Sequence, residues 1–102
     1  MDTPLENINA KSFTPHLNSK FKAHHGGAPV ELELIDVEER EHPRVEVFFL
    51  HFRGPSAPRL EQQIHRLEHE KVGAVTIFLT AIEADEQGIV YEAVFNRIRK
   101  RT

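Results

Sequence analysis

The sequence predicts an all-β domain of about six antiparallel strands, arranged as a small barrel or a two-sheet sandwich, with a short N-terminal helix. Two observations carry this prediction. Runs with apolar side chains at every second position recur along the chain, which is the pattern of strands with one buried face. Proline and glycine separate these runs, as in His42-Pro43 and Gly54-Pro55, and both residues favour turns.

The segment Val45–Pro55 is the most apolar part of the chain and holds three of its seven phenylalanines. In a strand, successive side chains point to opposite faces. One face then carries Phe48, Leu50 and Phe52, and the other carries Val47, Phe49 and His51. Because both faces are bulky, we expect this strand to be central, with its second face covered by the N-terminal helix or by a partner.

The elements before this strand follow from spacing and turn residues. Residues 1–8 are expected to form a flexible arm, and Asn9–His16 a short helix that Asn9 caps and Pro15 limits. A strand is predicted at Lys20–His24, and a hairpin loop at His25–Ala28.

The next strand is predicted at Val30–Glu39. Its alternation changes phase at Ile35, which indicates a β-bulge or a strand buried on both faces. A charged turn is expected over Glu38–Arg44. Because several acidic residues lie between Glu31 and Glu46, this edge should be locally acidic.

The segment Arg59–Lys71 has two readings. Leu60, Ile64 and Leu67 have helical spacing, whereas His65, Leu67 and His69 alternate as in a strand. Propensity and periodicity alone favour the helix.

The C-terminal part is predicted as two strands, Gly73–Glu83 and Ile89–Asn96, joined by the hairpin loop Glu83–Gly88. We therefore expect a single β domain over residues 9–96, followed by a basic tail over 97–102.

The composition excludes several classes of protein. The chain has 102 residues, 39% of them hydrophobic and 28% charged, as in a single globular domain. It has no cysteine, so disulfide scaffolds and thiolate zinc sites are excluded. The net charge of −3 disfavours nucleic acid. We find no membrane-length apolar run and no signal peptide, and we expect a cytoplasmic protein or one exported without a signal peptide.

Three motifs give the chain a resemblance to a known group of proteins. They are His51-Phe52-Arg53-Gly54-Pro55, Arg66-Leu67-Glu68-His69 and Tyr91-Glu92-Ala93-Val94-Phe95-Asn96. The chain resembles a family of small bacterial all-β proteins of uncharacterised function, often encoded near proteins like phage tail-collar proteins. The resemblance extends from about Phe13 to Asn96 and brings no catalytic residues. It implies that residues 63–70 are extended, and on that ground we predict a strand there.

The seven histidines raise the possibility of a metal site. On a helix, His65 and His69 would share a face at ligand spacing, with Glu68 beside them. On a strand the two histidines are about 13 Å apart and cannot share an ion. The competing interpretation is that His69 is a partly buried histidine bonded to the backbone or to a carboxylate. No cofactor is expected.

The sequence holds no catalytic set that we can identify. Acidic pairs occur, but no nucleophile or oxyanion-forming glycine loop accompanies them. Glu92 stands among apolar residues, and we expect it to bond to Arg53 or Arg66.

Our leading hypothesis is a non-enzymatic protein-binding or assembly module. It would act by pairing at a strand edge and by burying an apolar patch, with Phe49 and Phe78 as anchors and Arg53 as a further contact. The partner would be a tail-collar-like protein or a second copy of the chain. The alternative is a small metal- or ligand-binding barrel that uses His65, His69 and Glu68.

Overall fold

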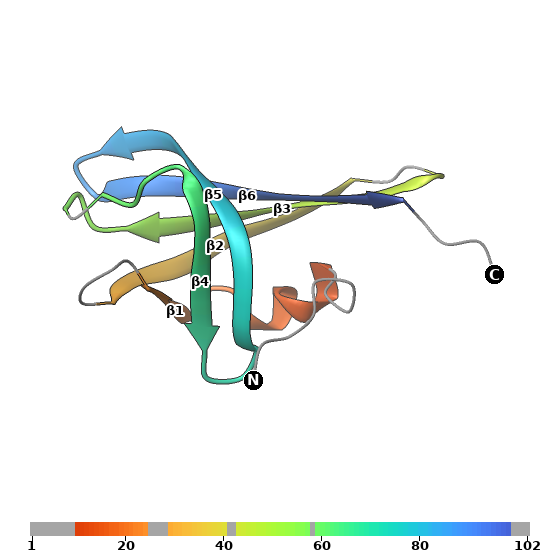
Figure 1. Ribbon diagram of the computed structural model, residues 1–102, viewed down its shortest axis with the longest axis horizontal. Helices are drawn as coiled ribbons and strands as arrows, with labels where there is room; N and C mark the ends of the chain where they lie inside the picture. Colours follow the sequence, from red (N-terminus) through yellow and green to blue (C-terminus); the bar gives the residue numbers. More distant parts are fainter. Residues whose placement is uncertain (1–9, 25–28, 41–42, 58, 99–102) are drawn as a thin grey trace.

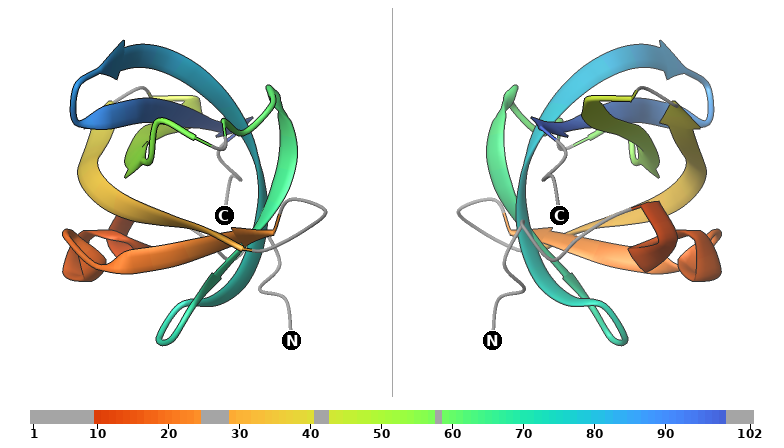
Figure 2. Two further views of the ribbon diagram at one scale, coloured as in Figure 1. Left: turned by 90° about the vertical axis from the view of Figure 1, so that its left-hand side faces the viewer. Right: turned by 90° about the vertical axis from the view of Figure 1, so that its right-hand side faces the viewer.

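The computed structural model describes residues 10–24, 29–40, 43–57 and 59–98. The described strands form one antiparallel sheet of six strands that closes into a barrel (Figures 1 and 2). This confirms the predicted all-β class and selects the barrel over the sandwich. Among the described residues, no helix has the length and apolar character needed to cross a bilayer.

Two short 3-10 helices precede the six strands. In chain order the elements are η2 (Ala10–Ser12), η3 (Thr14–His16), β1 (Lys20–His24), β2 (Val30–Arg40), β3 (Val45–Gly54), β4 (Gln63–His69), β5 (Gly73–Asp85) and β6 (Gly88–Ile98). Around the barrel the order is β1-β2-β3-β6-β5-β4, and β4 returns to β1.

Part of the sheet extends beyond the barrel. β3 and β6 pair over their whole length, from Val45–Ile98 to Gly54–Ile89, whereas β5 pairs with β6 only between the hairpin and the Thr80–Glu92 pair. β2, β3 and β6 therefore continue together as a three-stranded extension, which Figure 1 shows projecting from the barrel.

The inward face of β3 lies in the core as predicted, because Phe48, Leu50 and Phe52 are buried. The predicted short N-terminal helix is present as two 3-10 turns on either side of Phe13. Pro15 has no amide proton to donate along an α-helix, and the amides of Phe13 and His16 bond three residues back. The ring of Phe13 is fully buried and packs against aromatic rings of β1, β3 and β6.

The phase change in β2 is a β-bulge, which is one of the two alternatives that the sequence predicts. The register with β3 passes from Leu34–Phe52 directly to Asp36–His51, which leaves Ile35 as the extra residue. β2 continues to Arg40 because its residues still pair with β3. The expected start of a turn at Glu38 is therefore wrong.

The segment 63–69 is a strand, and the helix that periodicity favours is wrong. Its backbone pairs with β1 on one side and with β5 on the other, so these residues close the barrel. The backbone pairing on both sides outweighs helix propensity, which is a weak preference.

The last hairpin is tighter than predicted. β5 continues to Asp85 and β6 begins at Gly88, where φ is 127°, a value that favours glycine. β6 also continues to Ile98 because Arg97 and Ile98 pair with the start of β3. The predicted arm 1–8, the loop at His25–Ala28 and the tail beyond Ile98 lie outside the described residues.

Candidate functional site

Large apolar side chains gather on the outer face of β4, β5 and β6. Exposed fractions there are 63% for Ile64, 49% for Phe78, 49% for Ile82 and 53% for Val94. Ile64 and Phe78 are direct cross-strand partners. Phe78 and Val94 each lie two residues from the Thr80–Glu92 pair, on adjacent strands. We call these four residues the outer patch.

The outer patch lies beside a free strand edge. Beyond the Thr80–Glu92 pair, β5 continues along β4 while β6 continues along β3. Figure 1 shows the two strands diverging. Within the described part of the chain, no strand pairs with the other edge of β6 over residues 93–98. Such an edge presents main-chain donors and acceptors to an added strand.

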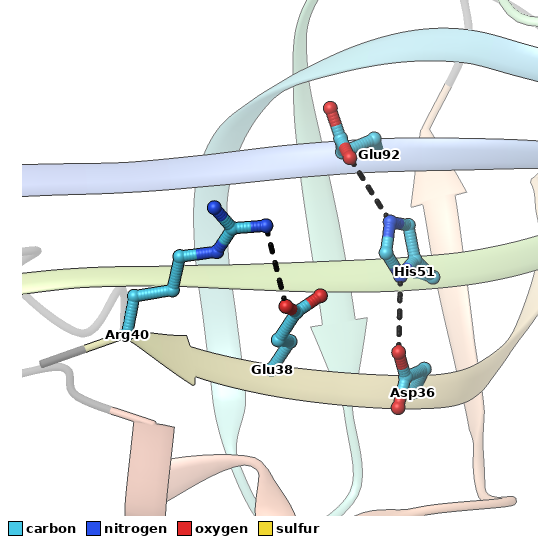
Figure 3. Close-up of polar contacts among 5 residues, drawn as sticks. All are labelled: Asp36, Glu38, Arg40, His51 and Glu92. Carbon is cyan, nitrogen blue, oxygen red and sulfur yellow. Dashed lines mark hydrogen bonds and ion pairs between the residues drawn. The ribbon is translucent and has the colours of Figure 1, made fainter.

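A row of polar side-chain contacts crosses the sheet next to the patch. His51 on β3 contacts Asp36 on β2 through Nδ1 (3.3 Å) and Glu92 on β6 through Nε2 (3.0 Å), as Figure 3 shows. The expected bond from Glu92 to Arg53 or Arg66 is therefore wrong: His51 is its cross-strand neighbour in the register and reaches it first. Further along β2, Arg40 pairs with Glu38 at 3.4 Å (Figure 3).

The three predicted contact residues differ in availability. Phe78 is half exposed in the outer patch. Phe49 is only partly exposed, and the guanidinium carbon of Arg40 lies 5.0 Å from its ring centroid, a cation–π geometry. The guanidinium of Arg53 donates to Asp85 at 3.2 Å. Phe78 is therefore the most accessible of the three.

The predicted metal ligands are not brought together. His65 is buried, with Nε2 donating to the carbonyl of Glu61 at 2.7 Å. Glu68 lies next to His69 in the strand and so faces the other side of the sheet. It pairs with His24, whose hydrogen bond is the main cause of the lowered pKa of Glu68. The described residues contain no group of three or more histidines, cysteines or acids arranged to hold a metal ion.

His69 has a hydrogen-bond network of its own. Its Nδ1 accepts from the amides of Lys71 (2.9 Å) and Val72 (3.1 Å), and its Nε2 lies 2.8 Å from the Oγ of Ser19. The Ser19 hydroxyl in turn donates to the carbonyl of His16. The competing interpretation of His69, a partly buried histidine bonded to backbone, is therefore confirmed.

The Ser19–His69 pair has the spacing of a nucleophile and its base but not the hydrogen bonding. Because two amides donate to Nδ1, the ring proton of a neutral His69 is on Nε2, where it donates to Ser19. A general base would need that nitrogen free to accept the serine proton. The pair is a structural link between the η3–β1 junction and the turn after β4.

Sequence reasoning identified Phe78 but missed the other members of the outer patch. Ile64, Ile82 and Val94 occupy outward positions in segments predicted as strands, and large apolar residues there were a usable signal. The contacts of His51 and His69 gave no such signal, because their side-chain partners lie 15 to 50 residues away in the chain.

A family model described as "Domain of unknown function (DUF6916)" matches residues 8–95. The chain belongs to this family. The match covers every described strand except the last residues of β6, and it agrees with the resemblance to an uncharacterised family. No curated protein and no solved structure matches the chain.

Proposed function

We propose that this domain is a non-enzymatic protein-binding module that docks a partner on the outer patch. The exposure of four large apolar side chains on adjacent strands carries the proposal. Single exposed apolar residues are common on protein surfaces, but several on neighbouring strands mark an interaction site more often, and Ile64 and Phe78 here are direct cross-strand partners. Phe78 is the central anchor, because aromatic residues supply much of the energy of binding interfaces.

The neighbouring strand edge supports a specific mode of docking. Val94 belongs both to the outer patch and to the edge of β6 that is free within the described residues. An extended partner segment that pairs with residues 93–98 would place alternate side chains over Val94 and Phe78. Main-chain bonds would then supply affinity, and the patch would supply specificity.

The charges around the patch favour an apolar partner surface. Arg53 already has a carboxylate partner in Asp85, and His51 lies between the carboxylates of Asp36 and Glu92. Covering the Arg53–Asp85 pair therefore leaves no lone charge from it in the interface, which would otherwise be costly. The partner needs to bring an apolar strand rather than a charged patch.

We propose a tail-collar-like protein encoded near the gene as the first partner to test. This choice rests on the family resemblance and not on the geometry of the site. A second copy of the chain is the other partner that the same surface would accept.

The test compares the full chain with Phe78→Ser in binding to the purified tail-collar-like neighbour by calorimetry. Loss of an anchor costs about 2 kcal/mol or more, which weakens Kd about 30-fold. Leu17→Ser is the matched control, because Leu17 is 38% exposed but lies outside the patch. Sedimentation of the same proteins at high concentration tests self-association.

Val94→Lys provides a second test of the docking mode. A lysine on a strand edge opposes the addition of another strand, so this variant should weaken binding as Phe78→Ser does. Equal affinities of all three variants and the wild type would show that the patch is not the docking site. A monomer that binds neither the neighbour nor itself would refute the proposed function.

A further inference from the structure

The structure gives His69 a position at the end of the barrel where three segments meet. The ring lies 4.4 Å from that of Phe21 on β1 and 4.8 Å from that of His16 on η3, centroid to centroid. Its nitrogens bond to Ser19 and to the turn after β4. We propose that His69 is an acid-operated latch, which holds this turn against the η3–β1 junction and releases it when the ring gains a second proton. The latch does not depend on the outer patch.

The hydrogen bonds show why protonation would open the contact. Nδ1 accepts from the amides of Lys71 and Val72, and the proton of the neutral ring is on Nε2. A second proton must therefore bind at Nδ1, where both amides point. Protonated Nδ1 is a donor, so both amides would lose this acceptor and the turn would lose its attachment to the ring.

The surroundings favour the neutral ring. Burial lowers the pKa of His69, the charge of His16 lowers it further, and Lys71 adds a smaller effect of the same sign. Glu70 acts in the opposite direction. A groove that His69 helps to line also holds other charged or titratable side chains, namely Lys20, Lys22, His24 and Glu68.

The direction of the pH effect follows from linkage. The native state prefers neutral His69, whereas the released ring takes up a proton near its ordinary pKa of 6.5. The latch is therefore fully closed above that pH and weakens as the pH falls below it. Because opening takes up one proton, the open population rises up to about tenfold for each pH unit.

The opening should stay local to the turn. The junction has other attachments, since the amide of Asn18 donates to the carbonyl of Leu34 (2.7 Å) and the amide of Leu34 donates to that of Ser19 (3.1 Å). These bonds do not involve His69. Release would expose the face of Phe21 and the partly buried Val72 at this end of the barrel, which gives an apolar contact surface that is present only in acid.

The test measures amide hydrogen exchange by NMR between about pH 7.5 and 5, across the ordinary histidine range. In the wild type, protection of the Lys71 and Val72 amides should fall up to about tenfold per unit below pH 6.5, while that of buried Leu67 in β4 changes far less. His69→Asn is the matched variant. The asparagine side-chain oxygen takes the place of Nδ1 and accepts from the same two amides without titrating, so protection should be flat with pH.

Four results would overturn the latch. The first is the same pH profile in the wild type and in His69→Asn. The second is parallel loss of protection at Leu67, which would indicate global unfolding. The third needs no variant: the ¹⁵N shifts of the wild-type ring at neutral pH would show the proton of His69 on Nδ1. His16→Gln should move the opening midpoint to higher pH, and an unchanged or lower midpoint would also contradict the proposal.

Discussion

Replacing Phe13 by alanine removes the ring through which the N-terminal segment enters the core. Phe13 is fully buried, and its ring centroid lies 6.2 to 6.3 Å from those of Phe21, Phe48 and Phe95. Truncating a buried phenylalanine costs about 3–5 kcal/mol, because apolar contacts are lost and a cavity remains. A domain of this length has a free energy of unfolding of about 5–15 kcal/mol. We therefore expect Phe13→Ala to fold with a greatly reduced margin.

Urea unfolding measures this change. Far-UV circular dichroism follows the unfolding, because the chain has no tryptophan to serve as a fluorescence probe. The urea midpoint should fall in proportion to the lost free energy if the dependence on urea is unchanged. Leu17→Ala is the control on the same segment, because Leu17 is 38% exposed and should cost about 0.5 kcal/mol or less. If Phe13→Ala is within about 1 kcal/mol of the wild type, the 3-10 segment is not part of the cooperative core.

Two further changes test hydrogen bonding and backbone geometry by the same measurement. Tyr91→Phe leaves the buried amide of Leu60 without the hydroxyl that accepts from it at 2.9 Å, so the protein should lose about 1–3 kcal/mol. Stability equal to the wild type would mean that another acceptor replaces the hydroxyl. Gly88→Ala puts a Cβ 2.1 Å from the carbonyl oxygen of Gly54, at a residue whose φ is positive. The backbone strain alone should lower the free energy of unfolding by about 1–3 kcal/mol. Glu86→Ala, at an exposed position in the same turn, is the control and should be near neutral.

The sequence predicted most strands because their burial is one-sided. In β1 and β3 the buried positions alternate as the side-chain pattern indicates, and in β5 they alternate over Val75, Ile77 and Leu79. The bulge in β2 was also visible, since an extra residue at Ile35 shifts the phase of every residue after it. Strand ends were less accurate: β2, β5 and β6 all continue further than predicted, because pairing with a neighbour extends a strand past its apolar run.

Segment 63–69 marks the limit of periodicity. The spacing of Ile64 and Leu67 suits a helix as well as a strand, and only the family resemblance pointed to the strand. The sequence predicted part of the outer patch, because Phe78 is one of its two predicted anchors. Its extent depends on the register that sets Ile64 opposite Phe78 and Val94 on the next strand, and a single sequence does not contain that register.

The sequence by itself determined the all-β class, the alternating faces and the lack of thiol chemistry, because these depend on residue types and on spacing along one strand. Only the tertiary structure decided the closure into a barrel, the free edge of β6 in the described residues, and the contacts of His51 and His69. Each depends on pairing between residues far apart in the chain, such as Ser19 with His69. A histidine has the same side chain whether it binds metal, transfers protons or holds a turn, and its neighbours in the fold decide which of these it does.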